Sequence, residues 1–153
     1  MKRISLVASA AFIVALSSCG KDFMKDQSGS FKVNGTAYTT ETDNVSAGYV
    51  NGGSQYLQIS LFTGNSQTNT PVVTVDLNRV DETVLFTSAN SGFTYTTLTG
   101  GTYTADYGQY KITSHEEGNP ASRHTEGTFE MTLHDLNNDT IKITEGKFYV
   151  NNY

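Results

Sequence analysis

Histidine and acidic side chains that could bind a metal ion gather in one polar stretch of the chain. His115 and His124 flank it, and Glu116, Glu117 and Glu126 lie beside them in the sequence. Zinc sites need three or four converging imidazole, thiolate or carboxylate groups. The nine-residue spacing of the two histidines fits no standard zinc pattern, and the chain has no His-Glu-x-x-His motif. We therefore expect a solvated acidic loop here, and we name no metal ligand and no cofactor.

A second acidic pattern has the spacing of the first half of a calcium-binding loop. It consists of Asp135, Asn137 and Asp139. Such a loop continues with a glycine and later a glutamate, where this chain has Thr140 and Gly146. Aspartate and asparagine are also common in tight turns, because both tolerate turn geometry. The pattern therefore favours an ordinary hairpin tip over a calcium site.

Four tyrosines that are close in the sequence are the candidate ligand contacts: Tyr95, Tyr103, Tyr107 and Tyr110. Exposed tyrosine rings can stack on sugars or anchor a protein partner. Tyrosine is also an ordinary strand residue, and the chain has no tryptophan, which weakens the case for a sugar platform. Contact with a glycan or protein partner and packing within the fold are therefore both open at this point.

The sequence lacks the common motifs of enzymatic catalysis. It contains no Gly-x-Ser-x-Gly elbow, no phosphate-binding loop and no pairing of a catalytic cysteine with a histidine. Acidic residues are scattered widely enough for a glycosidase pair to assemble in the fold, but no spacing points to one. We therefore expect a protein that is not an enzyme and name no catalytic residue, with a hydrolase as the third-ranked alternative.

The N-terminus has the layout of a secretory signal. A cationic start with Lys2 and Arg3 precedes an apolar stretch over 4–16, and the small residues Ser17 and Ser18 close it. The apolar stretch is too short for a membrane-spanning helix, which needs about 20 residues. We therefore expect residues 1–18 to be the signal segment of an exported protein.

The end of this segment also resembles the lipoprotein box of bacterial lipoproteins. Leu16-Ser17-Ser18-Cys19 has the leucine, the two small residues and the cysteine of that box. The resemblance implies cleavage just before Cys19, a diacylglyceryl group on its sulfur and a fatty acyl chain such as palmitate on its amine. Several acyl chains hold a protein firmly on a membrane. We expect a lipid anchor at Cys19 in the outer membrane, in either the periplasmic or the surface leaflet; an ordinary signal peptide with a coincidental cysteine is the alternative.

Composition limits the partners and favours strands. Without residues 1–18 the chain keeps 135 residues, enough for one domain, and a net charge of −7. An acidic chain of this kind lacks the basic stripe that a phosphate backbone requires, so we expect no nucleic-acid partner. The only cysteine is Cys19, which rules out an internal disulfide. Abundant Thr, Gly, Asn and Tyr with two prolines favour pleated strands joined by tight turns.

Alternating apolar residues predict short strands along this part of the chain. Asn34-Gly35 predicts a hairpin turn within 31–38. Further strands are expected over 45–50, 56–62, 72–77, 83–86, 101–106, 109–113, 127–134 and 141–150. At 83–86 a helical turn capped by Asp81 is the alternative. The apolar parity changes between Ile143 and Phe148, which predicts a β-bulge near Glu145-Gly146.

About eight or nine short strands without a convincing helix predict an all-β fold, either an antiparallel β-sandwich or a flattened β-barrel. The expected organisation is a signal segment over 1–18, a lipidated Cys19 and flexible tether over 19–30, and one all-β domain over 31–153. A kink at Tyr107-Gly108 is expected to separate two strands, and a polar loop is expected over 115–125.

Two parts of this domain are similar to small exported domains of unknown function from Bacteroidota. They are Phe31-Lys32-Val33-Asn34-Gly35-Thr36-Ala37-Tyr38 and, near the end, Gly127-Thr128-Phe129-Glu130-Met131 with Ile143-Thr144-Glu145-Gly146-Lys147-Phe148. The resemblance implies an all-β lipoprotein domain and names no catalytic residue. We expect a lipid-anchored cell-envelope protein that binds a ligand or partner through its β domain. The alternative is a structural or accessory subunit of a surface assembly, paired through an open strand edge at 148–153.

Overall fold

The computed structural model describes residues 25–40, 44–52, 54–63, 71–77, 83–87, 92–118 and 122–151. Within these ranges the chain forms ten strands and no α-helix, so no described helix is long and apolar enough to cross a membrane. The expected signal segment with Leu16, Ser17, Ser18 and Cys19 lies outside the described residues, and so does Asp81.

All described strand pairs are antiparallel, which confirms the predicted all-β class. The strands are β1 (Ser28–Val33), β2 (Thr36–Thr40), β3 (Val45–Gly52), β4 (Ser54–Phe62), β5 (Val72–Leu77), β6 (Thr83–Thr87), β7 (Thr94–Thr96), β8 (Thr102–Glu116), β9 (His124–His134) and β10 (Thr140–Asn151). Their order in the sheet is β2-β1-β10-β9-β8-β7-β5-β4-β3, and β6 pairs with β8 beside that path.

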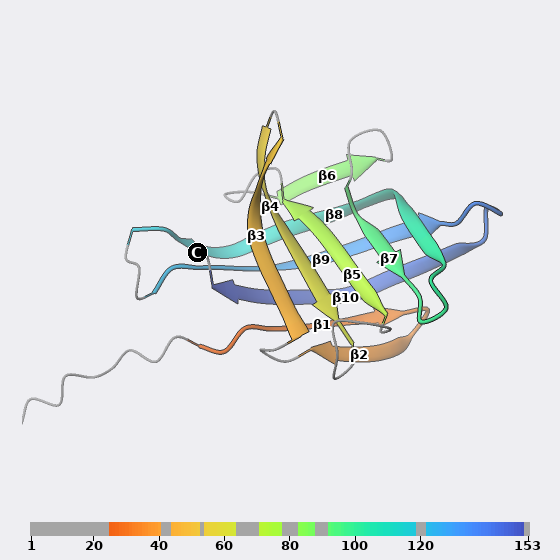
Figure 1. The fold of residues 1–153 in the computed structure, drawn as a ribbon, viewed down its shortest axis with the longest axis horizontal. Helices are drawn as coiled ribbons and strands as arrows, with labels where there is room; N and C mark the ends of the chain where they lie inside the picture. Colours follow the sequence, from red (N-terminus) through yellow and green to blue (C-terminus); the bar gives the residue numbers. More distant parts are fainter. Residues whose placement is uncertain are drawn as a thin grey trace, which may run out of the picture.

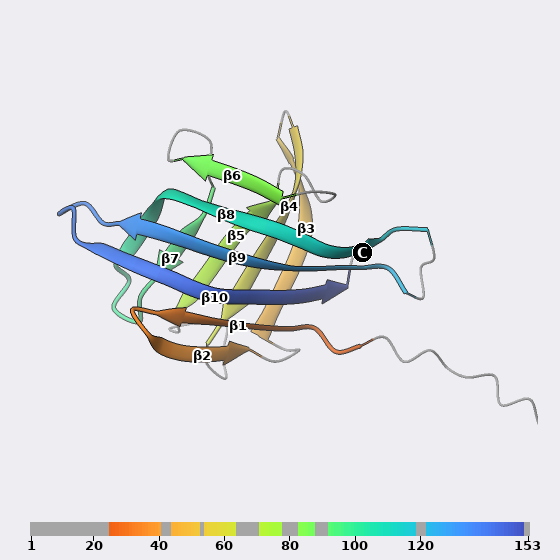
Figure 2. The same cartoon turned by 180° about the vertical axis from the view of Figure 1, so that it is seen from behind.

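The sheet folds over on itself into two layers. In Figure 1 the strands β3, β4, β5 and β7 cross obliquely in front of β8, β9 and β10, and Figure 2 shows the reverse face. The end strand β3 also contacts β10 across the core. The sheet is therefore nearly closed, as a flattened barrel is.

β8 joins the two layers by bending at a bulge. Its first residues pair with β7, whereas Tyr107 to Lys111 pair with β6, and β9 follows β8 along both parts. The register shifts between Ala105 and Tyr107. This bulge lies directly beside the expected kink at Tyr107-Gly108, but the expected division into two strands is wrong, because β8 runs unbroken from Thr102 to Glu116 and stays paired with β9.

The core lies between the layers, and the predicted alternation fills it. Half-buried strands place every second side chain inward. The residues expected to point inward are all buried: Leu57, Ile59, Leu61, Val73, Val75, Leu77, Phe129, Met131, Leu133, Ile141, Ile143, Phe148 and Val150. The sequence pattern therefore identified the main apolar faces of β4, β5, β9 and β10.

The predicted turn and the predicted bulge are both present. Asn34 and Gly35 have φ angles of 47° and 87°, which allows the tight turn between β1 and β2. The pairing of β10 with β9 shifts between Ile143 and Gly146. Within that bulge the positive φ, 53°, belongs to Glu145. Residues 83–87 form a strand, so the helical alternative there is wrong.

Several predicted boundaries differ from the structure. β1 begins at Ser28, so residues 28–30 of the expected tether belong to the sheet. They pair with β10 through their main chain, which needs no apolar side chain and left no sequence signal. The polar loop is shorter than expected, because His115 and Glu116 end β8 while His124 and Thr125 begin β9.

The C-terminal strand is not an edge strand. β10 pairs with β1 on one side and with β9 on the other. The expectation of an open edge at 148–153 is therefore wrong at Phe148 and Tyr149, whereas Val150 and Asn151 pair with β9 alone and the Asn151 N–H donates to the Gln27 side chain. A terminal strand offers an edge only where its neighbour is missing, and here the N-terminal β1 supplies that neighbour.

Candidate functional site

The outward side chains of β8, β9 and β10 form rows across the strands, on the face that Figure 2 turns toward the viewer. Antiparallel pairing holds directly opposite side chains about 5 Å apart. The rows are Tyr107-Thr132-Lys142, then Gln109-Glu130, then Lys111-Thr128-Lys147. Hydrogen-bonding and charged groups thus repeat at fixed spacings on a rigid surface.

Three adjoining hollows follow these rows, and we call them together the outer-face groove. Their volumes are about 580, 310 and 230 Å³. The first and second hollows share Gln109 and Glu130, and the second and third share Lys147. The three hollows are therefore neighbours along the outer face. The groove follows β9 from Thr132 to Glu126, about 20 Å at the rise of an extended strand.

The walls of the first hollow come from three neighbouring elements. Leu85 on the short strand β6 is 74% exposed and lines one side, and Lys142 on β10 lines another. The floor is formed where the buried residues Phe86, Met131 and Ile143 pass beneath the outward side chains. β6 pairs with Tyr107 to Lys111 of β8, so Leu85 lies opposite Gln109 on the side of β8 away from β9.

Each end of the groove carries an aromatic ring. Tyr107 lines the first hollow and is 59% exposed. Tyr149 lines the third, where Lys25 Nζ lies 4.1 Å from its ring centre and the His124 ring stacks at 5.3 Å. Partial burial, and then the charge of Glu126, raises the pKa of Tyr149. The Tyr149 ring is thus already in contact with the Lys25 ammonium and the His124 ring.

Every carboxylate lining the groove has a partner. Glu126 lies 3.8 Å from Lys25 Nζ, and Glu145 lies 2.7 Å from Lys32 Nζ. Glu130 accepts a hydrogen bond from the side-chain amide of Gln109. The acidic groups are therefore occupied within the protein.

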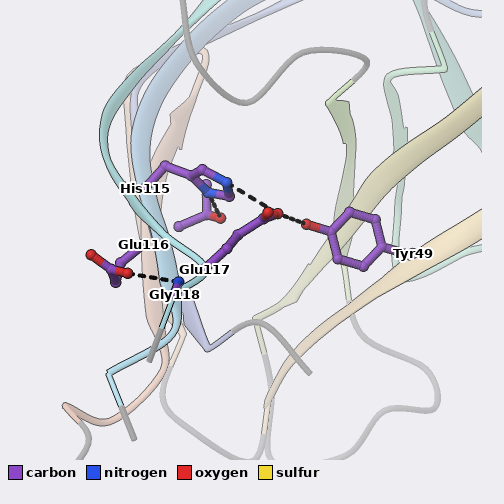
Figure 3. Close-up of polar contacts among 6 residues, drawn as sticks. Tyr49, His115, Glu116, Glu117 and Gly118 are labelled. Atoms are coloured by element: carbon purple, nitrogen blue, oxygen red, sulfur yellow. Dashed lines mark hydrogen bonds and ion pairs between the residues drawn. The ribbon is translucent and has the colours of Figure 1, made fainter. Parts of the chain in front are cut away.

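A second polar cluster lies on the other side of the sheet, where β3 approaches the end of β8 (Figure 3). Tyr49 donates a hydrogen bond to Glu117 at 2.9 Å, and Glu117 lies 3.2 Å from His115 Nε2. Burial, and then the hydrogen bond to Glu117, raises the pKa of Tyr49 to about 12. This chain of contacts fastens the second layer of the sheet to the first.

The same cluster has the composition of a nucleophilic triad but not the access. His115 Nδ1 lies 2.9 Å from the hydroxyl of Thr125, so Thr125, His115 and Glu117 stand in the order nucleophile, base and carboxylate. The side chain of Thr125 is fully buried. Its hydroxyl cannot attack a substrate, and the contact is structural.

Ser114 and His124 form a further serine–histidine pair. Nδ1 of His124 lies 2.7 Å from the carbonyl oxygen of Ser122 and donates a hydrogen bond to it. In the neutral ring, Nε2 then accepts a hydrogen bond from the Ser114 hydroxyl, with an N–O distance of 2.8 Å. Neither Ser114 nor His124 lines any of the three hollows of the groove. The pair has the hydrogen bond of a base and nucleophile, but no hollow of the groove opens onto it.

The residues considered as metal ligands do not converge. His115 and His124 lie on opposite faces of the sheet, because His115 bonds to inward-facing Thr125 and His124 immediately precedes that residue. Across the described ranges, no three His, Cys, Asp or Glu side chains are close enough to share an ion. Asp135 Oδ1 instead accepts the main-chain N–H groups of Asn137 and Asp139, at 2.9 and 2.8 Å, as in a turn.

The four candidate tyrosines do not share one surface. Tyr95 and Tyr110 are 6% and 1% exposed and belong to the core, so the expectation of ligand contact is wrong for both. Tyr103 is partly buried against Tyr95, with ring centres 6.2 Å apart. Burial, and then the Tyr38 hydroxyl, raises the pKa of Tyr95 to about 12. Only Tyr107 of the four lines the groove.

Sequence reasoning missed Tyr149 and the Gln109–Glu130 pair. Tyr149 lies between the buried residues Phe148 and Val150, so the alternation in β10 already placed it on the outward face. Gln109 and Glu130 meet only through the register of β8 with β9, which no local pattern specifies.

Comparison with known proteins adds no family to this geometry. The chain matches no protein-family model and shows no significant similarity to a curated protein or to a solved structure.

Proposed function

We propose that this chain is an exported, lipid-anchored envelope protein whose β domain binds an extended ligand in the outer-face groove and does not catalyse a reaction. The row of three neighbouring hollows along β9 carries the proposal of binding. The proposal of a lipid anchor rests on Leu16-Ser17-Ser18-Cys19.

The groove suits a ligand with many hydroxyl or other polar groups. Threonine hydroxyls, an amide–carboxylate pair and lysines line it, and the exposed ring of Tyr107 lies at one end. Aromatic rings with nearby directional polar groups are a common basis of recognition. Because these side chains stand on paired strands, their spacing is fixed before a ligand arrives. The lining of each hollow is more apolar than polar, and a glycan strand, whose sugar rings have apolar faces and hydroxyl edges, suits this mixture.

Binding is tested with the purified full chain and a panel of polysaccharides. Leu85→Ala and Leu136→Ala form a matched pair, since the same change is made once in the groove and once at a fully exposed hairpin tip. We expect Tyr107→Ala and Leu85→Ala to weaken binding by at least about fivefold and Leu136→Ala to leave it unchanged. Equal affinities for all three variants would overturn the assignment of the groove.

The anchor is tested by metabolic labelling with a fatty acid. We expect the native chain to incorporate label and Cys19→Ala to lose it. Labelling that survives the substitution would exclude Cys19 as the acceptor. Protease digestion of intact cells then assigns the leaflet, because only a surface-facing domain is cut before the outer membrane is opened.

The structural role proposed as the alternative has one observation in its favour. The main path of the sheet ends at β2 and β3 rather than closing through hydrogen bonds, and β2 is a short strand with mostly exposed side chains. Lysine on an edge strand opposes pairing with another chain. Ala37→Lys in β2 should then abolish self-assembly or co-purification of partners, whereas Leu136→Lys should not. Unchanged assembly in both variants would remove this role for the β2 edge.

A further inference from the structure

Three lysines in the outer-face groove have no ionic partner among the described residues. They are Lys111 on β8 and Lys142 and Lys147 on β10, and all three are exposed. The described ion pairs use Lys25 and Lys32 instead. Glu126 and Glu145 are paired with lysines and Glu130 is hydrogen-bonded to Gln109, so in the described part of the chain the charged groups of the groove without a partner are these three lysines.

This surplus of cations runs against the charge of the whole chain. The protein carries a net charge of −5. Four lysines and three glutamates line the three hollows, so the groove carries a small positive charge within an acidic protein, which favours anions there. A neutral ligand would gain nothing from this arrangement.

The spacing of the lysines indicates a ligand with repeated charges. Lys111 and Lys147 flank Thr128 in one row, so their Cα atoms are about 10 Å apart, two strand spacings. Lys142 and Lys147 lie farther apart along β10, on either side of its bulge. One compact anion cannot reach all three ammonium groups, whereas an extended polyanion can.

We propose that the outer-face groove binds an anionic glycan strand, a polysaccharide bearing carboxylate or sulfate groups; this inference rests on the proposed function. The three lysines meet acidic groups spaced along the strand, while Gln109 and the threonine hydroxyls bind sugar hydroxyls. Tyr107 lies at one end with its ring exposed, so a sugar ring can stack on it. An acidic peptide shares the charge but would leave the aromatic end and the hydroxyl-binding groups unused.

The test uses the full chain and four defined probes. These are polygalacturonate (carboxylate), dextran sulfate (sulfate), dextran (neutral) and polyglutamate (acidic peptide). We expect polygalacturonate or dextran sulfate to bind at least about tenfold more tightly than dextran or polyglutamate. Affinity for the favoured polyanion should fall as salt rises, because exposed charges are screened.

Substitutions that remove a positive charge from the groove and one that removes a negative charge should change the affinity in opposite directions. Each of Lys111→Gln, Lys142→Gln and Lys147→Gln should weaken binding about two- to fivefold, because one exposed ion pair adds little to the affinity. The triple variant should weaken binding by at least about tenfold, because the three losses combine. Glu130→Gln removes a negative charge from the same groove and should strengthen binding. Circular dichroism melting curves confirm that the variants remain folded.

The outcomes separate this inference from the proposed function. If dextran binds as tightly as the polyanions, through Tyr107 and without the lysines, the groove is a binding site and the anionic specificity is wrong. If polyglutamate binds as tightly as the polysaccharides, the ligand class is wrong. If no probe binds, or if binding ignores both Tyr107→Ala and the triple lysine variant, both proposals fail.

Discussion

The bulge in β10 supports a prediction that separates two roles of neighbouring residues. Glu145 adopts the positive φ of 53°, whereas Gly146 has no positive φ and packs tightly. A Cβ atom on Gly146 would lie 2.5 Å from the carbonyl oxygen of Phe129 and 2.6 Å from its ring. The glycine is therefore needed for space, and the glutamate carries the backbone strain.

The expected magnitudes follow from these contacts. Gly146→Ala should lower the free energy of unfolding by about 1–3 kcal/mol, because β9 is paired on both sides and Phe129 is buried, so neither can move aside. Glu145→Ala loses only the exposed pair with Lys32 and should cost at most about 1 kcal/mol. Glu145→Gly relieves the positive φ and should be about 0.5–1 kcal/mol more stable than Glu145→Ala.

Urea unfolding followed by tyrosine fluorescence measures these differences, since the chain has nine tyrosines and no tryptophan. A change of 1 kcal/mol corresponds to roughly 4 °C in Tm, so thermal melting gives an independent check. Gly146→Ala within about 0.5 kcal/mol of the native chain would refute the packing argument. A Glu145→Gly variant less stable than Glu145→Ala would refute the assignment of strain to Glu145.

Three further predictions concern ionisation and the central strand. Tyr49 and Tyr95 have folded pKa values of about 12, above the ordinary 10.0. Their stabilising effect is therefore complete below pH 10 and should be lost as the pH rises toward 12. Tyr49→Phe should reduce this alkaline loss of stability, and an unchanged pH profile would contradict the prediction. Burial raises the pKa of Asp76 despite its hydrogen bond from Gln58, so the ionised carboxylate is unfavourable in the folded protein. Asp76→Asn should therefore raise Tm at pH 7, and this gain should shrink toward pH 4, where the carboxyl group takes up a proton. A lower Tm at pH 7 would count against this prediction. Deleting residues 148–153 removes part of a strand paired on both sides and should abolish the cooperative melting transition; a native-like transition would show that β10 is dispensable there.

Alternation was a reliable guide wherever one face of a strand is buried. The two-residue alternation of apolar side chains predicted the burial of Leu57 and Ile59, and likewise of Met131 and Leu133. A shift of the strand by one residue would expose the whole apolar set, so this alternation determines which face is buried. The change of parity after Ile143 located the bulge for the same reason. The change of parity did not identify which bulge residue has the positive φ, because the choice between Glu145 and Gly146 depends on the Phe129 ring on the neighbouring strand.

The candidate site was less accessible to sequence reasoning. Tyr103 and Tyr107 have the same parity and would share a face on a regular strand, but the bulge after Ala105 turns Tyr107 outward and leaves Tyr103 partly buried. The groove itself depends on which strands are neighbours. Lys111 and Lys147 are 36 positions apart in the sequence and meet in one row only because β9 separates their strands.

The position of β1 also determines how the domain carries mechanical load. From Ser28 to Val33 this first strand is hydrogen-bonded to β2 on one side and to β10 on the other. Hydrogen bonds of antiparallel strands lie perpendicular to the strand direction, so a pull along β1 toward residue 25 loads them together in shear instead of opening them one by one. β10 lines the outer-face groove. Tension between a ligand held there and the N-terminal end of the domain therefore passes through two adjacent strands and bypasses the layer formed by β3, β4, β5 and β7.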